Sequence, residues 1–143
     1  MTMNRGVTYD SRHSYWDWGL LMKSCTVSPP KPKTNIVEVP GTDQVIDLSE
    51  VLTGEIHYKQ REIKCEYIMM CDRSKWPALY TDILNHLHGK LMQIILDEDK
   101  EYYYTGRAEV SKWKLERGAA EITITAQVEP YKTARYIPGK QVL

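Results

Sequence analysis

The sequence contains no phenylalanine and has no excess of charge of either sign. Its 143 residues carry 19 basic and 19 acidic side chains, divided almost evenly between the two halves. A chain without a basic surplus offers phosphate or anionic lipid no broad surface, so the composition disfavours free-standing nucleic-acid or membrane-surface binding. At this length, one domain can bury its own core without a metal or disulfide staple.

Targeting segments and long apolar runs are also missing. The first twenty residues are polar and aromatic, without the apolar stretch of a secretory signal. The longest apolar runs, at Tyr67–Cys71 and Ile94–Leu96, are far too short to cross a bilayer. We therefore expect the chain to be made and folded in a cytoplasm.

Cysteine is scarce, with three residues and no C-x-x-C motif. Cys65 and Cys71 fall in one expected strand, separated by about 20 Å at ~3.3 Å per residue, which is too far for a disulfide. The sequence therefore predicts buried thiols rather than a disulfide framework.

Most of the chain has the pattern of short β-strands, rich in branched and aromatic residues and bounded by Pro, Gly or acidic turns. The predicted strands are Leu20–Val27, Asn35–Val39, Glu55–Cys71, Leu91–Leu96, Glu101–Val110 and Ala119–Glu129. Short turns join the last three, which predicts an antiparallel meander. In the middle strand of the meander the inward phase slips between Val110 and Trp113, so we expect a β-bulge near Ser111-Lys112.

One helix is predicted at about residues 75–88. Apolar side chains recur at helical spacing from Trp76 to Leu87, with Asp72 or Ser74 available as a cap, and Gly89 is suited to end the helix. The predicted fold class is mainly β (α+β), a β-sandwich of antiparallel strands with this one flanking helix.

Two stretches do not look like core. The proline-rich segment from Ser28 to Lys33 must be extended and exposed, and Pro40–Asp43 is a turn that leads into the loop ending at Gly54. Such arms are candidates for contacts outside the domain. We expect a flexible N-terminus at residues 1–12, a single domain at 13–132, and a C-terminal tail or truncated linker at 133–143.

The motifs of catalysis and metal binding are absent. His86-x-His88 lacks the i, i+4 spacing of a helical metal pair, so a histidine at the helix end is the simpler interpretation. No P-loop, Gly-rich nucleotide loop, G-x-S-x-G or cysteine-protease signature is present. We therefore predict no enzyme activity, no catalytic residues, no cofactor and no metal.

An aromatic cluster near the N-terminus, Tyr9, Tyr15, Trp16 and Trp18, admits two interpretations. Exposed rings stack on bases or sugars. Tyrosine and tryptophan are also enriched in cores and subunit interfaces, which is the interpretation we favour.

Several segments, taken in order, resemble the N-terminal domain of the distal tail protein (Dit) family of long-tailed phages and prophages. They are Tyr15-Trp16-Asp17-Trp18-Gly19-Leu20, Pro29-Pro30-Lys31-Pro32-Lys33, Val39-Pro40-Gly41 with Asp43, Ile46 to Gly54, Trp76 to Gly89, Asp97 to Arg107, and Val128 to Lys132. The resemblance covers about residues 13–132. The family often continues into a second, galectin-like domain, whereas this sequence stops about a dozen residues after Pro130.

The resemblance implies a structural role in the virion. Such proteins are similar to tail-tube proteins in fold and form a hexameric ring that joins the tail tube to the baseplate or tail tip. The implied partners are other copies of the chain, the tail tube protein, the tail-tip or hub protein and the tape-measure protein. DNA passes through without specific binding, and no membrane is involved. The implied location is the virion tail, after synthesis in the host bacterial cytoplasm.

For the subunit interface we select eight residues in the proline-rich segment, the following loop and its return. They are Pro29, Pro30, Pro32, Asp43, Ile46, Leu48, Tyr58 and Arg61. We further expect Glu55–Arg61 to form an exposed hairpin arm. The alternatives from the residues alone are a carbohydrate- or host-binding β module and an unrecognised β-rich hydrolase.

Overall fold

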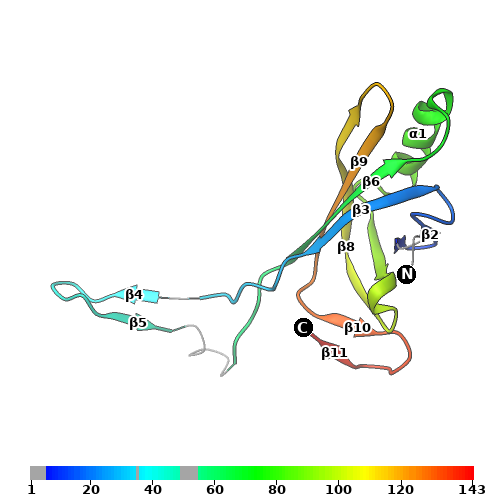
Figure 1. The fold of residues 1–143 in the computed structure, drawn as a ribbon. Helices are drawn as coiled ribbons and strands as arrows, with labels where there is room; N and C mark the ends of the chain where they lie inside the picture. Colours follow the sequence, from blue (N-terminus) through cyan, green and yellow to red (C-terminus); the bar gives the residue numbers. More distant parts are fainter. Residues whose placement is uncertain (1–5, 35, 49–54) are drawn as a thin grey trace.

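The computed structural model describes residues 6–34, 36–48 and 55–143. Antiparallel sheet dominates and one short α-helix flanks it (Figure 1), which confirms the predicted mainly β class. The elements are β1 (Val7–Tyr9), β2 (Arg12–His13), β3 (Leu20–Val27), β4 (Ile36–Glu38), β5 (Val45–Asp47), β6 (Arg61–Met69), η1 (Arg73–Lys75), α1 (Trp76–Leu87), β7 (Leu91–Leu96), η2 (Asp97–Asp99), β8 (Tyr102–Leu115), β9 (Ala120–Val128), β10 (Lys132–Ala134) and β11 (Gln141–Val142).

Within the described residues, the main sheet runs in the order β2-β1-β7-β8-β9-β6-β3, with antiparallel pairing throughout. The turn from Ser14 to Gly19 connects β2 to β3, which are the two ends of this order. Leu20 N donates to Ser14 O at 2.9 Å, and Ser14 N donates to Val7 O at 3.0 Å. The sheet therefore curves until its two ends approach each other, and the two layers of the expected sandwich belong to one continuous sheet.

The core lies inside this curved sheet. In β9 the side chains of Ile122, Ile124, Ala126 and Val128 are buried, as their alternation predicts. Across the ladder, β6 contributes the buried face from Ile63 to Met69. β7, β8 and β9 form the predicted meander, and the register shift between Val110 and Lys112 confirms the predicted bulge.

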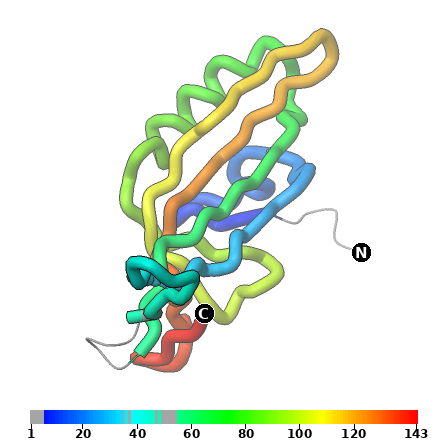
Figure 2. The backbone as a smooth tube through the Cα atoms, turned by 90° about the vertical axis from the view of Figure 1, so that its left-hand side faces the viewer, coloured from blue at the N-terminus to red at the C-terminus, as the bar shows by residue number. Residues whose placement is uncertain are grey.

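The helix α1 lies alongside the sheet and closes one side of the core (Figures 1 and 2). Its buried side chains are Trp76, Ile83 and Leu87, which belong to the predicted apolar stripe. Tyr80 stacks on Trp113 of β8, with ring centres 3.9 Å apart and 13° between the planes. The expected side-chain cap is replaced by η1, a 3-10 turn in which Lys75 N donates to the backbone of Asp72.

Strands form within both segments that flank the expected domain at residues 13–132. Within the segment predicted to be flexible, β1 lies inside the sheet between β2 and β7, because Val7 and Tyr9 are apolar enough to complete the core. Residues 1–5 lie outside the described part. The predicted tail forms β10 and β11, and β10 pairs with the start of β8 at Tyr102 and Tyr103, which β9 does not reach.

Gly106 tests how tightly the sheet is packed. A Cβ at this position in β8 would collide with the backbone of Gln127 and Val128 in β9. We expect Gly106→Ala to lower the free energy of unfolding by about 1–3 kcal/mol, as overpacking does, measured by urea denaturation.

Gly118 is the matched control, because no atom lies within 4 Å of the Cβ built there. Gly118→Ala should change the free energy of unfolding by less than about 0.5 kcal/mol. Equal effects of the two substitutions would contradict the packing described for β8 and β9.

Candidate assembly interface

Between β3 and β6 the structure describes residues 28–34, 36–48 and 55–60, and we call these residues the arm. Figure 1 shows it projecting far from the sheet. Close to the sheet its two legs pair through Lys33 N to His57 O at 2.7 Å and Lys59 N to Lys31 O at 2.8 Å. Further out, β4 pairs with β5, and the chain reverses in the turn between them.

The prolines explain why this segment is extended. Proline has a fixed φ and no N–H, so it fits a strand only where no donor is needed. Pro32 forms the bridge opposite Tyr58, while the flanking Lys31 and Lys33 supply the carbonyl and the N–H of the ladder. The proline-rich sequence thus allows pairing between the legs and disfavours helix.

The arm is tied to the sheet at its root. Ser28 N donates to Glu62 O at 2.9 Å, and Glu62 N donates to Ser28 Oγ at 2.8 Å. Arg61 Nε donates to Ser28 O at 3.0 Å, and its guanidinium lies 5.4 Å from the centre of the Tyr104 ring. Arg61 also reaches Pro130 O at 3.4 Å. These contacts fix where the arm leaves the sheet.

Apolar side chains on the arm remain exposed. Ile36 is 54% exposed, Val45 58%, Ile46 48% and Ile56 42%. Among the described residues, the core cluster includes no member of the arm. A two-stranded ribbon is at best marginally stable alone in water. The arm therefore has the composition of a segment that gains stability by packing against another surface.

The eight residues selected from the sequence all lie on the arm or at its root. Pro29, Pro32, Asp43 and Ile46 are exposed, whereas Pro30, Leu48, Tyr58 and Arg61 are half-buried. Several of them already make contacts within the chain. Arg61 forms the root, Pro32 is bridged to Tyr58, and Ile46 is paired in the β4–β5 ladder. The Tyr58 ring also meets Tyr131 edge-on, with centres 6.1 Å apart.

Residues 55–61 do not form the expected hairpin by themselves. The hairpin of the arm is formed by β4 and β5, and residues 55–60 are its return leg. Tyr58 and Lys59 pair with the proline-rich leg because that leg is extended and close in space. The sequence selection also missed Ile36, Val45 and Ile56, whose strand-like pattern does not reveal that they are exposed.

The N-terminal aromatic cluster divides between core and surface. Tyr9 and Trp18 are buried and stacked, with ring centres 6.2 Å apart. Trp16 is 67% exposed, and Tyr15 packs edge-on against it at 4.9 Å. Only the second pair is available to a partner.

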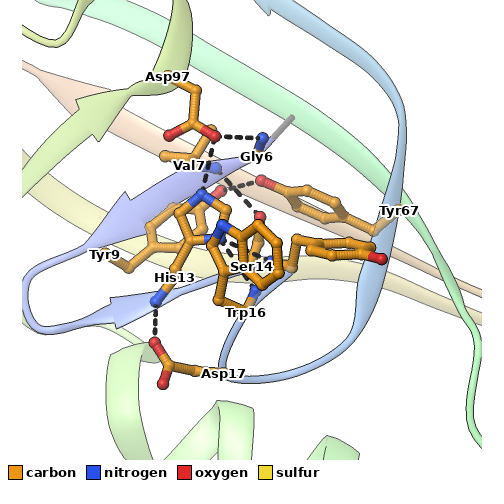
Figure 3. A network of polar contacts seen from close by, with 10 residues as sticks. Gly6, Val7, Tyr9, His13, Ser14, Trp16, Asp17, Tyr67 and Asp97 are labelled. Carbon is orange, nitrogen blue, oxygen red and sulfur yellow. Dashed lines mark hydrogen bonds and ion pairs between the residues drawn. The ribbon is translucent and has the colours of Figure 1, made fainter. Parts of the chain in front are cut away.

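A polar network holds this N-terminal segment in place (Figure 3). His13 Nδ1 accepts the N–H groups of Tyr15 and Trp16, each at 3.1 Å. The proton of the neutral ring is therefore on Nε2, which donates to Asp97 Oδ2 at 2.8 Å. The same carboxylate oxygen accepts Gly6 N at 3.0 Å. The network joins β1, β2 and the end of β7.

His86 of α1 and His88, which caps its C-terminal end, also have structural contacts. His86 Nε2 donates to the Tyr9 carbonyl at 2.8 Å, and His88 Nδ1 accepts Val110 N at 3.1 Å. They tie the helix to β1 and β8. In the described parts of the chain, no group of three or more His, Cys, Asp or Glu side chains is arranged to hold a metal ion. No described helix is long and apolar enough to cross a membrane.

Tyr9 and Tyr67 meet in the core, with their hydroxyl oxygens 2.8 Å apart (Figure 3). Burial is the main reason that the pKa of each tyrosine is raised well above its ordinary value of 10.0, and neighbouring groups contribute. The neutral hydroxyls bond to each other between β1 and β6, which lie near opposite ends of the sheet order. One hydroxyl donates and the other accepts, in a region closed to water.

No family model matches the sequence, and no curated protein matches it. Solved structures do match. The crystal structure of the SPP1 phage Dit protein, described as a paradigm of the hub adsorption apparatus in phages that infect Gram-positive bacteria, superposes with a TM-score of 0.75 at 16% identity. The match covers 91% of this chain and 52% of that one. This chain therefore spans about half the length of the Dit protein and shares the fold of that half.

A second solved structure, the virion of a native gene transfer agent particle, matches with a TM-score of 0.46 at 10% identity. The match covers 92% of this chain and 96% of that chain. This score is too low to support an argument about fold or function.

The buried tyrosine pair predicts loss of stability in alkali. Because the folded-state pKa of both tyrosines is raised, the unfolded chain releases their protons first as pH rises above about 10. The contribution of the pair is fully present below that pH. Above it, the free energy of unfolding should fall by up to about 1.4 kcal/mol per pH unit for each tyrosine.

The measurement is urea denaturation from pH 8 to about 11.5, with wild type compared with Tyr67→Phe. The variant should show a shallower decline above about pH 10. Tyr136→Phe, at a side chain that is 72% exposed, is the control and should follow wild type. Parallel curves for all three proteins would contradict the burial argument.

Proposed function

We propose that this chain is a structural component of a phage tail, a distal tail protein whose copies form a ring between the tail tube and the baseplate or tail tip. The likeness to the SPP1 Dit fold over 91% of the chain supports this class of protein. The observation that carries the proposal is the arm, on which Ile36, Val45 and Ile46 are exposed and lie far from the main sheet.

The geometry of the arm is compatible with a ring. The arm projects away from its own sheet, so a surface that buries it lies on another copy of the chain and differs from the arm itself. Contacts between two different surfaces are heterologous, and they generate closed rings when the rotation permits. The family resemblance suggests six subunits.

Charge balance suits a conduit for DNA. With 19 basic and 19 acidic side chains, the chain has no surplus with which to hold phosphates, and strong binding would hinder passage. In this role the partners are the tail tube protein, the tail-tip or hub protein and the tape-measure protein. The protein acts by shape and assembly in the virion tail, with no catalytic step.

A second function is favoured by one observation. Trp16 is 67% exposed beside Tyr15, and exposed aromatic pairs provide stacking surfaces for sugars. Binding of the monomer to a glycan array, lost in Trp16→Ala, would support a carbohydrate-binding role. An array without signal would contradict the carbohydrate-binding role and leave assembly as the single proposed role.

The assembly proposal predicts rings that depend on the arm. Native mass spectrometry and electron microscopy of the purified chain should show closed rings. Ile46→Asp should weaken association by about thirtyfold or more, because a carboxylate would be buried at an apolar contact and losses of about 2 kcal/mol are typical of such central residues.

Leu91→Asp is the matched control. Leu91 is 61% exposed, but it lies on β7 in the body of the sheet. At concentrations where wild type is monomeric, both variants should keep the wild-type melting temperature. The Leu91 variant should still form rings. A chain that is monomeric at all accessible concentrations, or rings that survive Ile46→Asp, would overturn the proposal.

A further inference from the structure

Two cysteines lie directly opposite each other on neighbouring strands. Cys25 of β3 and Cys65 of β6 are register partners, and their Sγ atoms are 2.8 Å apart. Opposed residues of antiparallel strands have Cα atoms roughly 4.5–5.5 Å apart, which falls within the range that a disulfide spans. The two thiols can therefore be joined without moving the strands.

The two thiols differ in access to solvent. Cys65 is fully buried, whereas Cys25 is exposed at the edge of the sheet. Beside Cys25 is an opening lined by Met22 and Val27 of β3 and, from the other end of the sheet, by Val7, Leu96 and Asp97. A small oxidant in solution thus reaches Cys25 first, with Cys65 directly behind it.

The surroundings of Cys65 favour its reactive form. Its pKa is lowered, chiefly by the hydrogen bond from Cys25, with further hydrogen bonds from Tyr67 and Tyr9; burial acts in the opposite direction. The thiolate is the nucleophile in thiol chemistry. Cys71 lies beyond the end of β6, away from this pair in the register.

We propose that Cys25 and Cys65 are an oxidation site, at which a peroxide converts the two thiols into a cross-strand disulfide. Cys25 loses its thiol proton and its thiolate attacks one peroxide oxygen. The O–O bond breaks, the released hydroxide takes up a proton, and the products are a sulfenic acid and water. Cys65 Sγ then attacks the sulfenic sulfur, the S–O bond breaks, and the thiol proton leaves with the hydroxyl as a second water. The two sulfurs are oxidised and the peroxide is reduced.

The position of this site gives it a structural consequence. The two cysteines are 40 residues apart in sequence and bracket the whole arm, which leaves the sheet three residues after Cys25 and returns four residues before Cys65. A disulfide there closes the arm into a loop at its base. By constraining the unfolded chain, a loop of this size should raise the melting temperature by about 10 °C.

The test uses the full chain, reduced first and then treated with hydrogen peroxide under native conditions. Intact mass should fall by two hydrogens, and the number of thiols that can be alkylated in denaturant should fall from three to one. Peptide mapping should recover Cys25 linked to Cys65. The melting temperature should rise, and dithiothreitol should reverse the rise.

Two variants make the result specific. Cys71→Ser should form the same disulfide and show the same rise, whereas Cys25→Ser should show neither. Sulfinic acid on Cys25 with Cys65 still a thiol would overturn the proposal, as would cross-links only between molecules. These outcomes do not depend on whether the chain forms rings, so the proposed function stands or falls separately.

Discussion

The fold depends on the contact between Tyr9 and Tyr67, which joins opposite ends of one curved sheet. Their hydroxyls bond at 2.8 Å in a region that both side chains keep dry. β1 and β6 are separated by three strands in the sheet order, so this bond forms only when the sheet curves round. The turn at Ser14–Gly19 links the two end strands of the order directly, while the His13–Asp97 contact holds β1 and β2 against the end of β7. A short N-terminal strand therefore completes the core, although it looks like a disordered end in the sequence.

Because the curved sheet closes its own core, the arm does not pack into that core. The core is filled by residues of the main sheet and α1, together with Trp18 of the turn before β3, and the arm contributes none of the described core residues. Its root is nevertheless well tied, through Ser28, Glu62 and Arg61. Assembly by arm exchange between identical subunits requires two features. The main sheet must fold without the arm, and the apolar arm must leave the sheet at a fixed point. The facing cysteines lie at the same root, where a bond would restrain the ribbon without covering it.

Local pattern predicted much of this fold. The period of α1, the alternation in β9, the meander and the bulge after Val110 follow from short-range spacing, and the structure confirms them. Pairing between strands that are far apart in the sequence could not be predicted from the local pattern. The sequence does not show that Val7 reaches β7, that β10 covers the start of β8, or that Cys25 faces Cys65. For the candidate site, proline content located the arm, but the exposure of Ile36 and Val45 depends on which strands leave the sheet.

The central claim is that the sheet is stable alone and that the arm gains its order from another copy of the chain. Hydrogen–deuterium exchange at low and high protein concentration tests this most directly. Amides in β6 and β9 should be protected at both concentrations, whereas residues 36–47 should exchange quickly in the monomer and become protected as the chain assembles. Equal protection of residues 36–47 in monomer and assembly would contradict the account.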